Sequence, residues 1–151
     1  TMDLAGLGLL APSPPGQMLG AKALPAQPLG APLPVPDAAV ATAKFFPRWA
    51  GDDATLAALI GRLGPESPVA LNERYQLTMP VDVARIDCPA LVVESEHDDK
   101  DTHPPGQDKA VADFYGGDHV FLADASHCFM VDPDWQVGLN AILDWVRGLD
   151  G

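Results

Sequence analysis

The second half of the chain alternates short apolar runs with helical patterns, and this alternation restricts the fold most. The β-branched run Ala90–Val93 predicts a buried strand, and a second apolar run covers His119–Leu122. Residues 106–115 between them have a helical pattern that a Gly-Gly pair ends, and another begins at Asp132. Strand–helix–strand–helix order gives parallel strands with right-handed crossovers, so the sequence predicts an α/β fold with flanking helices.

The first half adds a third apolar run. Residues 4–11 are almost wholly apolar and are closed by prolines and a glycine, which is typical of a strand buried on both faces. Residues 12–36 then hold eight of the sixteen prolines and few charges. This segment is expected either to lie extended on apolar surface or to form a mobile loop.

Helical patterns fill residues 37–78. Asp37, Asp52 and Ser67 each stand where a helix cap is expected, and the patterns that follow end at prolines or at a Gly-Pro pair. We therefore expect a core strand in 1–15, a proline-rich stretch with a helical insertion in 16–80, and the βαβα part of the core in 81–151. From Asp132, the last helix is expected to bury one apolar face made of Trp135, Leu139, Ile142 and Val146.

Charge and cysteine content exclude several classes of partner. A net charge of −12 and a pI near 4.3 argue against binding to nucleic acid or to an anionic membrane surface. No apolar run reaches the roughly 18 residues that a membrane span needs. Cys88 and Cys128 lack disulfide-framework or metal-finger spacing, so we expect buried structural thiols and a cytoplasmic location.

His127 has a favourable position for catalysis. It ends a small polar turn, residues 123–126, that follows an apolar run, and the acidic loop 94–101 follows the preceding predicted strand. The carboxyl ends of neighbouring parallel strands meet at one edge of a sheet, so a carboxylate of this loop and the imidazole should meet there. A carboxylate bonded to one ring nitrogen fixes the tautomer that a general base needs.

Four aromatic residues of the helical insertion are candidates to line an apolar substrate pocket: Phe45, Phe46, Trp49 and Tyr75. They could equally be ordinary core between the helices.

A metal site in the acidic loop is the competing interpretation. His97, Asp98, Asp99, Asp101 and His103 fall within seven residues, but no tight ligand spacing such as HExxH occurs. Because carboxylate-rich loops are more often solvated than loaded with metal, we expect neither a metal nor another cofactor.

Three segments together resemble the α/β-hydrolase superfamily. Residues 86–98 (IDCPALVVESEHD) look like its strand and acid segment, residues 123–133 (ADASHCFMVDP) like its histidine loop, and residues 7–12 (LGLLAP) like the strand before its lid. The resemblance spans nearly the whole chain but only the C-terminal half of that fold. It implies that Asp98 is the triad acid, with Asp99 and Asp101 as competitors, that His127 is the base, and that residues 16–78 occupy the position of the family's helical lid.

The nucleophile of that family is missing. No G-x-S-x-G elbow occurs, Ser13 stands between prolines, and Ser95 and Ser126 are expected to bond loop backbone. The family places its serine before the acid, and three strands make a small sheet with an unpaired apolar edge. We therefore expect a partner, an N-terminal hydrolase chain that carries the nucleophile, arising by cleavage before Thr1, from a second gene or by a nick.

The expected reaction is hydrolysis, or acyl transfer, of an ester, thioester or lactone with a small apolar acyl group. Two other hypotheses remain: a non-catalytic relative that lost its nucleophile and binds a ligand, and a hydrolase that uses the amino-terminal Thr1 as nucleophile.

Overall fold

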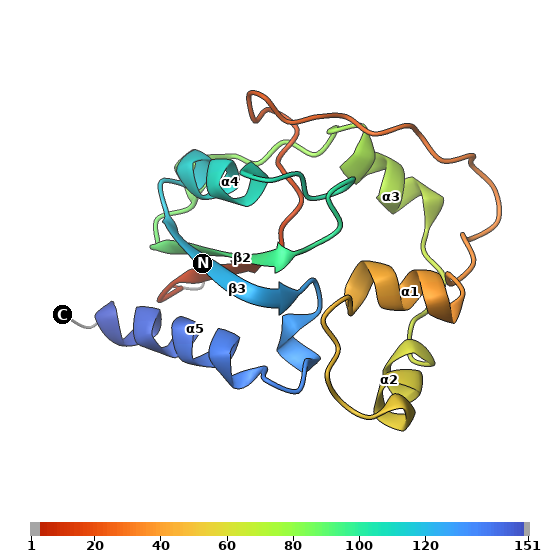
Figure 1. Ribbon diagram of the computed structural model, residues 1–151. Helices are drawn as coiled ribbons and strands as arrows, with labels where there is room; N and C mark the ends of the chain where they lie inside the picture. Colours follow the sequence, from red (N-terminus) through yellow and green to blue (C-terminus); the bar gives the residue numbers. More distant parts are fainter. Residues whose placement is uncertain (1–3, 150–151) are drawn as a thin grey trace.

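A three-stranded parallel sheet lies at the centre of the chain (Figure 1). The computed structural model describes residues 4–149. The strands are β1 (Leu7–Leu10), β2 (Ala90–His97) and β3 (Asp118–Ser126), in the spatial order β1-β2-β3. Both pairings are parallel, so the predicted α/β fold is confirmed.

One helix covers each face of the sheet. Helix α4 (Gln107–Tyr115) packs on one face and α5 (Gln136–Gly148) on the other, as Figure 1 shows. The central strand β2 contributes Val92 to the α4 side, and Leu91 and Val93 to the α5 side. All three side chains are fully buried. The continuous apolar run of β2 is therefore explained by burial on both faces.

Three short helices connect β1 to β2: α1 (Ala38–Phe45), α2 (Asp53–Ile60) and α3 (Pro68–Tyr75). Each begins at its predicted cap, because Asp37, Asp52 and Ser67 accept a hydrogen bond from the backbone N–H three residues later. In Figure 1, α1 lies just beyond the ends of the β2 and β3 arrows. The insertion therefore stands at the sheet edge where catalytic loops are expected.

The proline-rich stretch is an ordered excursion over the surface. Met18 is buried in the cluster with Val92, while Leu24 N–H donates to the Tyr75 carbonyl. Gln27 and Asn72 exchange two hydrogen bonds between backbone and side-chain amide. In the structure this stretch therefore runs extended over the surface, with these contacts along it.

The strands extend further than predicted. Residues 94–97 belong to β2 and residues 123–126 to β3, although both segments were expected to be loops. The predicted start of the last helix, at Asp132, was also wrong. The Asp132 carboxylate accepts the Ser126 N–H instead of capping a helix, a 3₁₀ turn covers Phe129–Val131, and α5 begins at Gln136.

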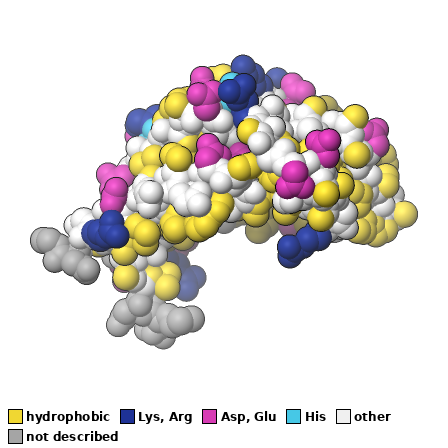
Figure 2. All heavy atoms as spheres, turned by 60° about the horizontal axis from the view of Figure 1, so that its bottom comes forward, with side chains coloured by type: hydrophobic (Ala, Val, Ile, Leu, Met, Phe, Trp, Pro, Cys, Tyr) yellow, Lys and Arg dark blue, Asp and Glu magenta, His cyan; other side chains and the backbone are white. Residues whose placement is uncertain are grey.

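Helix α5 buries only part of the predicted face, because Ile142 packs on the core but Trp135, Leu139 and Val146 do not. Gly138 is buried against the Phe129 ring, with Ile142 and Trp145 packed on the same cluster. Apolar residues cover more of this helix than one sheet face can bury, so part of the expected face remains exposed. This exposed α5 face consists of Trp135, Leu139, Leu143 and Val146. Hydrophobic side chains cover much of the surface in Figure 2, which turns the α5 side toward the viewer.

Strand β1 forms an open edge. Among residues 4–149 it pairs with β2 alone, and Leu10 at its end is exposed. An unpaired apolar edge is a template for another strand. Within the same residues, no helix has the length and apolarity to cross a membrane.

Candidate active site

Asp98 and His127 meet at the carboxyl edge of the sheet. Each is the first residue after its strand, and the residues before them, His97 and Ser126, are register partners. The His127 Nδ1 atom lies 2.8 Å and 2.9 Å from the two carboxylate oxygens of Asp98. The side chain of Asp98 is 5% exposed and that of His127 is 28% exposed. A buried carboxylate thus holds a partly accessible imidazole.

A register shift in the sheet brings these two residues together. Ser95 pairs with Leu122, but two residues later His97 pairs with Ser126, four residues further along β3. The extra length is taken up around Asp124, whose φ is +58° and whose N–H donates to the Glu96 carboxylate. Without the shift, His97 would face Asp124, and His127 would extend past Asp98.

Replacing Asp124 by valine should destabilise the protein more than replacing it by glycine. Both changes remove the carboxylate. A β-branched residue at positive φ, however, lowers the free energy of unfolding by about 1–2 kcal/mol through backbone strain that glycine does not have. Thermal unfolding of the two variants measures the difference. Equal melting temperatures would show that the backbone at Asp124 carries no strain.

The histidine loop is tied to the end of α1 on both sides of His127. Cys128 N–H donates to the Phe45 carbonyl at 3.1 Å, and Arg48 N–H donates to the Ser126 hydroxyl at 3.2 Å. The Phe45 ring centroid lies 5.6 Å from that of His127. The helical insertion therefore positions the imidazole directly.

The other carboxylates of the acidic loop have other roles. Asp99 forms an ion pair with Lys44 at 3.0 Å, and its backbone N–H donates to Asp98. Burial alone raises the pKa of Asp99, but the hydrogen bond and charge of Lys44, with hydrogen bonds from Asp101 N–H and the Thr102 hydroxyl, outweigh it, so the pKa lies below its usual value. Asp101 is exposed. Only Asp98 contacts His127 among the three.

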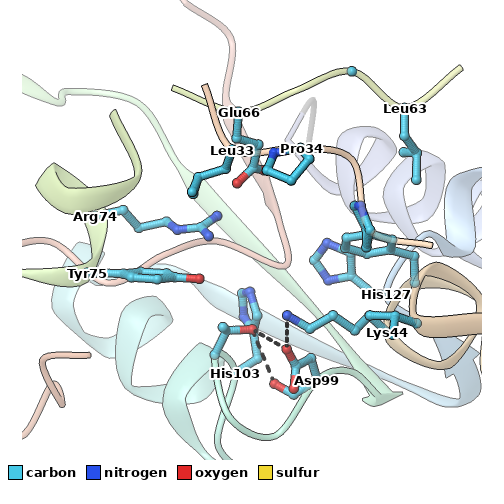
Figure 3. Close-up of a pocket in the computed structure, with 15 residues that line it drawn as sticks. Leu33, Pro34, Lys44, Leu63, Glu66, Arg74, Tyr75, Asp99, His103 and His127 are labelled. Atoms are coloured by element: carbon cyan, nitrogen blue, oxygen red, sulfur yellow. Dashed lines mark hydrogen bonds and ion pairs between the residues drawn. The ribbon is translucent and has the colours of Figure 1, made fainter. Parts of the chain in front are cut away.

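A cavity of about 310 Å³ opens beside His127 (Figure 3). In Figure 3, Arg74 and Tyr75 enter from one side, and Lys44 and His127 from the other. Of the four predicted aromatic residues, Phe45 and Tyr75 line this cavity. Phe46 and Trp49 do not; Phe46 is buried and packs edge-on against Trp49, with centroids 6.0 Å apart.

The sequence patterns did not indicate several polar residues that line the cavity. Lys44, Glu66 and Arg74 line the cavity, as does His103, which was considered only as a metal ligand. Lys44 and Arg74 stand in the last turns of α1 and α3. A basic residue is ordinary there because it interacts favourably with the helix dipole, so the sequence carried no distinguishing signal.

No serine of the described residues is hydrogen-bonded to His127. The hydroxyl of Ser126 accepts a backbone N–H, as expected, but Ser95 is buried within β2 and its hydroxyl has no hydrogen-bond partner, so that expectation was wrong for Ser95. Ser13 lines two smaller hollows and not the cavity beside His127. Thr1 lies outside the described residues.

Cys128 should react slowly with iodoacetamide in the folded protein. Burial, with the charges of Asp132 and Asp98, raises the pKa of its thiol to about 11. Since the thiolate is the nucleophile and an ordinary thiol has a pKa near 8.5, alkylation at pH 7 should be roughly a hundredfold slower than in unfolded protein. Peptide mass spectrometry at pH 7 and 9 should show the rate rising with pH. Rapid labelling of folded protein at pH 7 would contradict this.

In this arrangement a histidine can act as a general base. With Nδ1 held by Asp98, the Nε2 atom of His127 is left to accept a proton.

Comparisons of this chain with protein families, with curated proteins and with solved structures give no match.

Proposed function

We propose that residues 1–151 supply the acid and the base of a Ser-His-Asp triad in an α/β-hydrolase-type enzyme. The enzyme would hydrolyse, or transfer the acyl group of, an ester, thioester or lactone. The observation that carries this proposal is the contact of His127 Nδ1 with both oxygens of a buried Asp98 at two adjacent strand ends. This is the carboxylate–imidazole geometry of a triad.

Each residue has a defined role in the reaction. His127 Nε2 takes the proton of the serine hydroxyl as that oxygen attacks the acyl carbon, and later gives it to the leaving group. Asp98 holds the tautomer and stabilises the imidazolium that forms between these two steps. Its burial keeps the carboxylate fixed and strengthens that interaction.

The serine in this proposal belongs to a separate N-terminal chain. Two surfaces of the described residues support such a partner: the open edge of β1 and the exposed α5 face. Parallel sheets are normally covered on both faces and extended by further strands. A partner that adds strands at β1 and a helix against α5 would bury both surfaces and place its own strand end near His127.

The substrate would enter the cavity beside His127. Phe45 and Tyr75 offer apolar contacts for a small acyl group, and helices α1, α2 and α3 would act as the lid. The lid role rests on the place of these helices beyond the strand ends.

A fluorophosphonate probe applied to the native assembled protein tests the proposal. The probe should label a serine outside residues 1–151, as read by intact-mass and peptide mass spectrometry. His127→Ala should lose the label, while His97→Ala should keep it. A label on Ser13, Ser95 or Ser126 would place the nucleophile in this chain. No label at all would favour a non-catalytic binding protein.

A further inference from the structure

A second imidazole lies beside the Asp98–His127 pair. His103 comes from the loop before α4, and its ring centroid lies 5.4 Å from that of His127. One potential ligand atom of Asp98, one of His103 and one of His127 all lie within 4.8 Å of one another. Of the loop residues considered as metal ligands in the competing interpretation, Asp98 and His103 belong to this cluster, whereas His97 gathers with Glu96 and Asp124.

His103 is held by a carboxylate of its own. Its Nδ1 atom lies 3.5 Å from Asp108 Oδ1, and the side chains of His103 and Asp108 are 7% and 2% exposed. The second oxygen of Asp108 is buried with no hydrogen-bond partner. A histidine that binds metal with one nitrogen commonly donates its other ring N–H to a carboxylate, and this contact leaves Nε2 of His103 free.

The cluster has an excess of buried negative charge. Asp98 and Asp108 are both buried. Two cations line the neighbouring cavity, Lys44, which pairs with Asp99, and Arg74. Buried carboxylates need a compensating positive charge.

The donor set suits one kind of ion. Two imidazoles and one carboxylate are typical ligands of Zn²⁺, whereas Mg²⁺ and Ca²⁺ prefer oxygen alone. His103 and His127 both line the cavity, which leaves an open side for a water ligand. Figure 3 shows both histidines facing this space.

We propose that Asp98, His103 and His127 form a Zn²⁺ site, with Asp108 orienting His103, and that Zn²⁺ binding inhibits the enzyme. The inhibition rests on the proposed function; the binding does not. Zn²⁺ takes a lone pair of neutral His127 and a carboxylate oxygen of Asp98, so His127 can no longer accept the serine proton.

The test begins with the native assembled protein, stripped of metal. Titration with ZnCl₂ in competition with a chromophoric chelator then measures its affinity for Zn²⁺. One equivalent should bind. His103→Ala should weaken the affinity about 10- to 100-fold, and Asp108→Asn should weaken it by about tenfold through lost orientation of His103. His97→Ala is the matched control and should bind as the unmodified protein does, because it alters the other cluster.

Co²⁺ in place of Zn²⁺ gives a readout that does not depend on activity. The visible absorption of a four-coordinate Co²⁺ complex should appear in the unmodified protein and be lost in His103→Ala. Thermal unfolding without metal, with His103→Gln as a second variant, separates loss of binding from loss of folding.

Three results would overturn the site: no binding below millimolar Zn²⁺, equal affinity of His103→Ala, or loss of binding in His97→Ala. Inhibition of ester hydrolysis should follow the same affinity and reverse with a chelator. Hydrolysis that Zn²⁺ leaves unchanged would refute the inhibition. A protein that binds Zn²⁺ as expected but does not hydrolyse esters would instead contradict the proposed function.

Discussion

Under the proposed function, replacing His127 by alanine should reduce hydrolysis of an activated ester by the assembled protein at least about a thousandfold. Alanine cannot accept the serine proton, and no other imidazole of the described residues contacts Asp98 by a hydrogen bond. The loss should lie in kcat, because the cavity walls that bind the acyl group remain. Stopped-time assays with a chromogenic ester measure it.

His97→Ala is the matched control for this change. His97 is also a half-buried histidine at the same sheet edge, but it faces Glu96 and Asp124. We expect its activity to stay within about tenfold of the unmodified enzyme. Thermal unfolding should show both variants folded. Turnover of His127→Ala at the unmodified rate would refute the role of the base.

Replacing Asp98 by asparagine should reduce kcat by about 10⁴-fold while the fold is retained. The amide can occupy the space of the carboxylate, but it offers an N–H toward His127 Nδ1 and favours the wrong tautomer. It also removes the charge that stabilises the imidazolium. A pH profile of kcat would show the remaining activity rising with pH as hydroxide substitutes for the base.

Asp99→Asn tests whether the effect belongs to Asp98. Both are adjacent carboxylates at the end of β2, but Asp99 pairs with Lys44 and does not contact His127. We expect a loss below about tenfold from this neighbour. A larger loss for Asp99→Asn than for Asp98→Asn would reverse the assignment of the acid.

Local chemistry explains which parts of the fold were predictable. Helix caps at Asp37, Asp52 and Ser67 depend on a side chain and a backbone N–H three residues away, so sequence alone specifies them. The core of β2 was equally clear, because burial on both faces leaves an uninterrupted apolar run.

Features set by distant contacts were not predictable. Asp132 has the sequence context of a helix cap, but its carboxylate accepts a hydrogen bond from the Ser126 N–H instead. The buried face of α5 depends on where the Phe129 ring packs against Gly138. A hydrophobic pattern that covers more than one helix face does not say which part meets the sheet.

In the candidate site, too, some features could be predicted from the sequence and others depend on distant contacts. That a carboxylate should meet His127 followed from the parallel strand order, whereas the register shift at Asp124 determines which atoms meet. The choice between Asp98 and Asp99 depends on Lys44, which is more than fifty positions away in the sequence. Phe45 and Phe46 are adjacent, yet only Phe45 faces the cavity.

The two backbone bonds between the histidine loop and the end of α1 have a mechanical consequence. Because Cys128 and Arg48 each donate across this junction, α1 cannot swing away without pulling His127 from Asp98. Under the proposed function, any lid motion would therefore involve α2, α3 or the proline-rich stretch, while α1, although part of the cover, would stay fixed to the sheet. In that proposal, α1 would hold the histidine loop in place, and the rest of the insertion would be the part that moves.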